Sequence, residues 1–264
     1  MAETKPWSVL DAVRAAERQG ETLASVEHRP WPPPDGPWLL GQTLEDLLFA
    51  HWRAPADALR ALLPSGLELD LYDREAWVGV VPFRLTSLRA RGLPPLPFAS
   101  SFLGLNTRTF VTAGGKPGIW FLSLDATSRL AVLAARYGFK LPYYLAEGRA
   151  ERRDAWVSFE ARRRDSRGAP AAFRARYRPT GRALEPEPGS LAHFLTERYS
   201  LYTVASDGRV LRAEIHHPPW SLQEAELEIK ENTMPPRDIE LLDDEPVVHF
   251  SARQDIVLWL TDDA

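Results

Sequence analysis

The segment of residues 76–85 places the strongest constraint on how this chain can fold. In an extended strand, successive side chains point to opposite faces, so alternate residues share a face. Both alternating sets of this segment are apolar. They comprise Trp77, Val81 and Phe83 on one side, and Val78, Val80 and Pro82 on the other. A strand that is apolar on both faces is buried on both. We therefore expect a central strand in a closed or covered sheet.

The rest of the pattern consists of short strands with a few helices between them. Residues 102–112 and 118–125 predict a hairpin around a Gly-Gly-Lys-Pro turn. Helical spacing of apolar residues predicts a helix over 128–137. The segments 143–152, 156–164 and 171–178 are typical of an antiparallel meander. This order predicts an α+β fold that is mainly antiparallel β.

Proline divides the chain into an arm and a domain. Residues 29–37 contain five prolines, and proline provides no backbone donor for a helix or a central strand. We therefore expect residues 1–37 to form an N-terminal helix and a Pro-rich arm. Residues 38–264 are expected to form a single β-rich domain, since β barrels and sandwiches of this length are often undivided.

Composition excludes several kinds of function. The chain has no cysteine, which excludes disulfides, thiolate nucleophiles, iron–sulfur clusters and cysteine zinc sites. A formal net charge of -4 provides no basic excess for nucleic acid. No run approaches the roughly 20 apolar residues of a membrane-spanning helix, and the first residues do not resemble a signal peptide. We expect a cytoplasmic protein without nucleic-acid or membrane partners, and its oligomeric state stays open.

Several blocks of sequence, in order from Gln42 onward, resemble the YqjF-like uncharacterised family. These blocks are residues 49–52, 76–83, 106–111, 141–144, 196–199 and 217–220. Residues 118–146 are also similar to the acetoacetate decarboxylase pattern of a strand ending near Asp, a short helix and then Phe-Pro-Lys-Lys-Leu-Ala. The resemblance to this wider superfamily implies a β-cone or barrel-like fold, with a few short helices, around a small-molecule pocket.

The resemblance breaks down at the reactive residues. The decarboxylase forms a Schiff base through a lysine whose pKa is lowered by burial and a neighbouring cation. Aligning the two patterns places Tyr143 and Tyr144 at the two lysine positions, and a phenol cannot form an imine with a ketone. Lys140 approaches the reactive position only in a register that disrupts the Pro-Tyr-Tyr match. We therefore expect an activity without a Schiff-base lysine.

A polar strand offers the best candidate for a ligand site. Asn106, Arg108 and Phe110 alternate and so share one face. An arginine beside an amide can hold a carboxylate through two hydrogen bonds, which suits an acidic or keto-acid ligand. The alternative is a structural ion pair with a carboxylate such as Asp125. The resemblance implies that this strand lies near the pocket.

Four further side chains could take part, each with a structural alternative. The hydroxyl of Tyr143 could donate a proton to a substrate oxygen, or the ring could simply pack. Tyr143 and Tyr144 point to opposite faces on a strand, so at most one of them lines a cavity. His51 could be a general base or a hydrogen-bonded core histidine. Glu197 could enter the pocket, or it could pair with Arg198 at a junction between helix and strand.

The sequence thus predicts a small-molecule ligand that is anionic or contains a carbonyl group. Arg108 and Tyr143 are the candidate catalytic residues. The candidate ligand-binding residues are Asn106, Arg108, Tyr144, His51, Phe110 and Glu197. No cofactor is expected, and no metal either, because the adjacent His216 and His217 point opposite ways on a strand and have no third ligand nearby. Two functions stay open: an enzyme that acts without an imine, and a non-catalytic binding or sensing protein.

Overall fold

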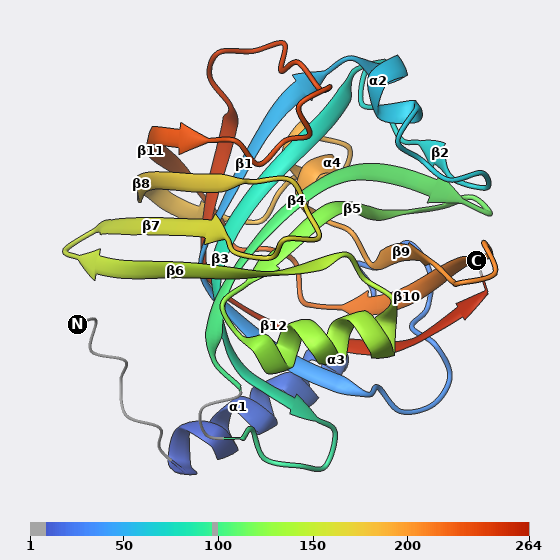
Figure 1. The fold of residues 1–264 in the computed structure, drawn as a ribbon. Helices are drawn as coiled ribbons and strands as arrows, with labels where there is room; N and C mark the ends of the chain where they lie inside the picture. The colour runs from blue at the N-terminus through green and yellow to red at the C-terminus, as the bar shows by residue number, and fades with distance from the viewer. Residues whose placement is uncertain (1–8, 97–99, 264) are drawn as a thin grey trace.

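The computed structural model describes residues 9–96 and 100–263 and shows a β-rich protein with short helices (Figure 1). The helices are α1 (Val9–Glu21), α2 (Ala56–Arg60), α3 (Arg129–Phe139) and α4 (Leu191–Thr196), with a 3-10 turn η1 (Thr22–Ala24). The first strands are β1 (Leu40–Ala54), β2 (Glu68–Leu69), β3 (Ala76–Ala90), β4 (Phe102–Ala113), β5 (Lys116–Ala126) and β6 (Tyr143–Arg153). The others are β7 (Trp156–Arg163), β8 (Ala172–Leu184), β9 (Ser200–Val204), β10 (Val210–His216), β11 (Leu222–Asn232) and β12 (Val247–Asp263).

The strands form one sheet that partly closes on itself. Their order is β10-β9-β5-β6-β7-β8-β11-β12-β1-β3-β4-β2, with additional pairings of β10 with β12 and of β5 with β4. These pairings connect β1, β3, β4, β5, β9, β10 and β12 into a ring. Among the described strands, only the pairings of β5 with β6 and with β9 are parallel. The predicted mainly antiparallel α+β fold is confirmed.

Strand β3 separates two apolar cores, as its two apolar faces predicted. Inside the ring, Val81 and Phe83 pack in a cluster with residues of β1, β5, β9 and β12. On the opposite face, Val80 packs with Phe159 of β7 and Phe173 of β8. The meander β6–β8, which Figure 1 shows crossing in front of β3 and β4, therefore covers the outside of the ring wall.

The expected helix over 128–137 is α3, which begins after Ser128 and ends at Lys140 in a left-handed conformation. The described part of the N-terminal arm packs on the ring. Arg18 forms an ion pair with Asp255 of β12 at 3.0 Å, and Arg89 of β3 donates to Gln19 at 2.7 Å. Residues 1–8 of the predicted arm lie outside the described residues. Within the described part of the chain, no helix has both the length and the apolar character needed to cross a membrane.

Candidate functional site

Three neighbouring strands bring His51, Gly79 and Arg108 into one row inside the ring. His51 of β1 pairs with Gly79 of β3, and Gly79 pairs with Arg108 of β4. Directly opposed residues of antiparallel strands present their side chains on the same face. A Cβ atom on Gly79 would lie 2.7 Å from Cδ2 of His51 and 3.4 Å from Cγ of Arg108. The missing side chain at position 79 is therefore what leaves room for the imidazole and the arginine.

Arg108 is a buried cation without a carboxylate partner among the described residues. It is 6% exposed, and its Nη2 donates to the carbonyl of Leu195 in α4 at 2.9 Å. Its Nε has no hydrogen-bond partner within residues 9–96 and 100–263. The sequence offered Asp125 as a structural partner, but Asp125 instead accepts two hydrogen bonds from Arg163, at 2.8 and 2.7 Å. Arg108 thus keeps an unused donor on a buried guanidinium group.

A second arginine, Arg198, lies on the same aromatic ring. The Cζ atoms of Arg108 and Arg198 are 5.7 and 4.8 Å from the ring centre of Phe110. Arg198 is also buried, and its Nη1 pairs with Asp70 at 2.6 Å. Its Nη2 has no partner in the described structure. Among the described residues, Arg198 therefore has one carboxylate partner and Arg108 has none, which leaves an excess of positive charge.

The pKa of Arg108 reflects this excess. Burial, followed by the charge of Arg198, lowers the pKa of the Arg108 guanidinium to about 9. This value is still above neutral pH, so the group carries its charge. An anion bound beside Arg108 would offset both causes of the lowered pKa, because it would neutralise a buried charge and screen it from Arg198.

His51 completes the row as a neutral imidazole. It is fully buried, and neither ring nitrogen has a hydrogen-bond partner among the described residues. Burial, then the charges of Arg108, His249 and Arg198, lower the pKa of His51 well below its ordinary value. A neutral imidazole offers one donor and one acceptor, so His51 can bind a ligand oxygen or hydroxyl.

Buried histidines make the stability of the fold depend on pH. Burial is the first cause that lowers the pKa of His51, His216, His217 and His249, in the case of His216 to about 4. Below the unfolded pKa of 6.5, the unfolded chain binds protons that the folded chain excludes. We expect the free energy of unfolding to fall as the pH drops from about 6.5 toward 4, with His216 alone contributing about 3 kcal/mol.

Urea unfolding at a series of pH values measures this effect. A free energy of unfolding that stays flat, or rises, on acidification would contradict the neutral state of these histidines. His216→Gln should flatten the profile, because it removes an imidazole whose pKa in the folded protein is about 4.

Tyr143 and Asn106 lie on the same inner face as Arg108. Asn106 of β4 pairs with Leu124 of β5, and Leu124 pairs with Tyr143 of β6. Tyr143 packs against the apolar cluster inside the ring. Burial raises the pKa of its phenol to about 12, so the hydroxyl stays protonated and can donate a hydrogen bond. Asn106 and Arg108 are two residues apart on β4, as the alternation of this strand predicted.

Tyr144 lies on the outer face, away from this row. It pairs with Asp125, and the Cζ of Arg163 lies 4.1 Å from the centre of its ring. The two adjacent tyrosines thus point opposite ways. Tyr144 was one of the candidate ligand-binding residues, but its place beside Arg163 leaves it outside the site that we describe.

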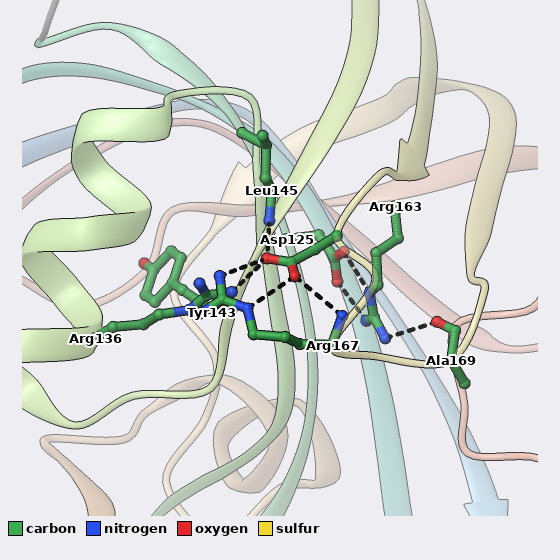
Figure 2. Close-up of polar contacts among 8 residues, drawn as sticks. Asp125, Arg136, Tyr143, Leu145, Arg163, Arg167 and Ala169 are labelled. Carbon is green, nitrogen blue, oxygen red and sulfur yellow. Dashed lines mark hydrogen bonds and ion pairs between the residues drawn. The ribbon is translucent and has the colours of Figure 1, made fainter.

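An ionic network on the outer side holds the backbone of Tyr143 (Figure 2). Arg136 of α3 donates through Nε to the carbonyl of Tyr143 at 2.6 Å and pairs with Asp165 at 2.5 Å. Asp165 also accepts from the backbone N of Leu145 at 3.3 Å and pairs with Arg167 at 2.9 Å. These contacts therefore connect helix α3 to the start of β6 and to the loop after β7, next to Tyr143.

Glu197 has a structural role in this arrangement. The hydroxyl of Tyr199 donates to Oε2 of Glu197, and the backbone N of Trp220 donates to Oε1 at 2.8 Å. Both carboxylate oxygens are thus engaged at the junction of α4 and β9. The sequence offered Arg198 as the structural partner of Glu197, whereas Arg198 pairs with Asp70. Arg198 itself was not among the predicted site residues.

Two cavities lie beside the ring. One of about 580 Å³ lies between α1 and the segment after β3, where Val13, Arg89 and Leu93 line it. The other, of about 340 Å³, is lined by residues that include Phe121 and Lys140. Neither is lined by Arg108 or His51. Within the described residues, no group of three or more His, Asp or Glu side chains is placed to hold a metal ion.

The sequence matches proteins of unassigned activity. The model of the DUF2071 family, which is described as an uncharacterized conserved protein, matches residues 41–255. The uncharacterized protein YqjF of Bacillus subtilis strain 168 is 47% identical over 227 residues, which cover 86% of this chain and 93% of that protein. The match thus extends over most of both chains.

The fold is similar to that of solved acetoacetate decarboxylases and related enzymes. The acetoacetate decarboxylase of Legionella pneumophila has a TM-score of 0.60 at 14% identity, with 100% of this chain and 98% of that chain covered. The enduracididine biosynthesis enzyme MppR, complexed with pyruvate, has a TM-score of 0.58 at 12% identity, with 89% and 92% covered. Identities this low establish a shared fold and leave the chemistry of the site to be argued from its residues.

Proposed function

Because the chain belongs to the DUF2071 family and folds like acetoacetate decarboxylase, we propose that the inner face of its strand ring binds a small anionic carbonyl compound. The observation that carries this proposal is the pair of buried guanidinium groups of Arg108 and Arg198, of which only Arg198 pairs with a carboxylate, that of Asp70, among the described residues. Buried charges in proteins are ordinarily paired. A bound anion supplies the missing negative charge.

The chemistry of the inner face suits a carboxylate. The unused donors, Nε of Arg108 and Nη2 of Arg198, belong to planar guanidinium groups that can hold both oxygens of a carboxylate. Electrostatic attraction is stronger in such a buried place than in water. The fold neighbour MppR is described as complexed with pyruvate, a 2-oxo acid, which supports this class of ligand.

In the catalytic form of the proposal, Arg108 holds the carboxylate and Tyr143 acts on the carbonyl group. The phenol of Tyr143 donates a hydrogen bond to the carbonyl oxygen and stabilises the negative charge that develops there. No covalent bond to the protein is formed, because a phenol cannot condense with a ketone to an imine. Asn106, on the same face of β4, provides an amide for a further oxygen of the ligand.

A thermal-shift titration with 2-oxo acids tests this function. We expect pyruvate and 2-oxobutyrate to raise the melting temperature, and the rise should grow with the logarithm of their concentration. At a hundredfold excess over the Kd, binding should add about 2.7 kcal/mol to the free energy of unfolding. Methyl pyruvate, which keeps the ketone but lacks the charge, is the matched control and should have little effect. Equal stabilisation by the acid and its ester would contradict binding through the arginines.

Borohydride added with each ketone checks for an imine. We expect no increase in the mass of the protein, whereas a covalent adduct on Lys140 would replace the Tyr143 mechanism by lysine chemistry.

Tyr143→Phe separates binding from turnover. This variant removes one hydroxyl and keeps the ring that packs against the inner cluster. We expect the pyruvate-induced shift to remain and any consumption of the 2-oxo acid, followed by NMR, to fall by roughly 100-fold, a usual size for general acid catalysis. Tyr144→Phe is the matched control on the outer face and should leave both measurements unchanged. Equal loss in both variants would contradict the assignment of Tyr143.

A non-catalytic binding protein is the second candidate, and one observation favours it. A general base works best with a pKa near the working pH. His51 has a pKa well below the ordinary histidine value, and Tyr143 has a pKa of about 12. Neither group exchanges a proton readily near neutral pH. Stabilisation by 2-oxo acids without any product by NMR would identify a binding protein.

A further inference from the structure

The wall of the ring is interrupted at residues 121–123. On one edge, β5 pairs with β9 through Ile119 and Trp120 and then with β6 through residues 124–126. Residues 121–123, between these pairings, pair with neither β9 nor β6. On its other edge, β5 pairs with β4, with an irregularity between Thr107 and Arg108. The hydrogen-bonded wall of the ring is therefore incomplete on one side of Phe121.

The smaller cavity lies at this interruption. Its volume is about 340 Å³, and its lining includes Trp120, Phe121, Lys140, Pro142 and Thr203. The hydroxyl of Thr203 on β9 donates to the carbonyl of Lys140 at 2.7 Å, which joins β9 to the end of α3. The cavity thus has one rim on β9 and the other on the segment that leads into Tyr143.

Phe121 belongs to both the cavity and the inner face. It lines the cavity, it is only 9% exposed, and it packs in the apolar cluster inside the ring. It also pairs with Arg108 across β4 and β5. One aromatic side chain therefore stands between the cavity and the row that contains Arg108.

The charges favour the passage of an anion. Lys140 is exposed and lines the smaller cavity, and it forms no ion pair within the described residues. The charges of Arg108 and Arg198 lie further inside. Positive charges along a concave path raise the local concentration of anions and speed their association.

We propose that this cavity is the entrance to the inner face, that Lys140 attracts the anion there, and that the ring of Phe121 is the gate through which it reaches Arg108. The inference rests on the function proposed above. It assigns the cavity to small anions, because Lys140 lines it and its volume is about 340 Å³.

The cysteine-free chain allows a direct test. Val81→Cys places a single thiol on the inner face, and Val80→Cys places one on the outer face at the adjacent residue; both valines are buried. The probes are an anionic sulfonatoethyl and a cationic trimethylammonioethyl methanethiosulfonate. The measurement is the rate at which each probe modifies each thiol, followed by mass spectrometry in the folded protein.

We expect Phe121→Ala to increase the rate of modification of the Val81→Cys thiol by about tenfold, and Phe121→Trp to reduce it, because the size of the gate controls access. The Val80→Cys thiol should not respond. Lys140→Gln should slow the anionic probe and speed up the cationic one, because it removes a positive charge from the path.

An unchanged rate at Val81→Cys in Phe121→Ala, or equal acceleration of both thiols, would overturn the entrance. The first outcome places the route elsewhere, and the second indicates general loosening of the fold.

The pyruvate titration of the unmodified chain keeps the two proposals distinguishable. A pyruvate shift without any gating effect overturns the entrance alone. Gating without a shift by any 2-oxo acid supports the entrance and removes the proposed ligand class.

Discussion

Arg108→Met is expected to stabilise the ligand-free protein while it abolishes the response to 2-oxo acids. Methionine fills a similar volume and carries no charge, so the variant removes a buried cation that lacks a carboxylate. The carbonyl of Leu195 loses its donor, at a cost of about 1 kcal/mol. We expect a net gain of about 1–3 kcal/mol in the free energy of unfolding, since the relief of an unpaired buried charge is the larger effect.

Arg198→Met is the matched control for this variant. The same substitution there leaves the carboxylate of Asp70 without its partner, so we expect a loss of about 3 kcal/mol. Urea unfolding without ligand, together with the pyruvate-induced shift, measures both effects. If Arg108→Met destabilises the protein as much as Arg198→Met does, the guanidinium of Arg108 serves the fold, and the case for an anion site is lost.

Gly79→Val is expected to cost about 2–3 kcal/mol and to eliminate binding, because the added side chain occupies the space of the imidazole. The new Cβ would lie 2.7 and 2.8 Å from two atoms of the His51 ring, and valine adds two further methyl groups. Gly79 is not among the glycines with positive φ, so the strain is steric and the backbone itself would accept valine. Urea unfolding and the pyruvate titration measure the two losses.

Two further variants test this explanation. Gly138→Ala, at a position in α3 where a Cβ would meet nothing within 4 Å, should leave the stability equal or raise it by about 1 kcal/mol. Combining Gly79→Val with His51→Ala should recover much of the lost stability, because the new side chain then has room. Failure of the double variant to recover would place the cause of the loss outside this row.

Local patterns in the sequence were sufficient to predict most elements of the fold. The two apolar faces of β3, the hairpin of β4 and β5, and helix α3 follow from residues close together in the chain. Closure of the ring could not be predicted in this way. It depends on pairings such as Leu211 with Asp263 and Ile119 with Leu201, which join segments that no local periodicity connects.

The same limit applies to the candidate site. Strand alternation predicted that Tyr143 and Tyr144 point to opposite faces, but only the pairing of Leu124 with Tyr143 determines which one faces inward. Arg198 stands beside Glu197 in the sequence, where the pattern predicted Glu197 as the ligand-binding residue. Arg198 is placed beside Arg108 and Phe110 by its ion pair with Asp70, which lies 128 residues away from Arg198 in the sequence. Ion pairs of this kind are decided by the fold as a whole.

The position of β12 has a consequence for how the protein is made. This strand pairs with β1, β10 and β11, and Figure 1 shows it beside β1 although the two lie at opposite ends of the colour scale. While the ribosome is still translating β12, the long edge of β1 has no partner there. Sheets built from such distant segments form slowly, and unpaired edges invite association between nascent chains. The ring can thus close only after β12 has left the ribosome, when nearly the whole described chain has been synthesised.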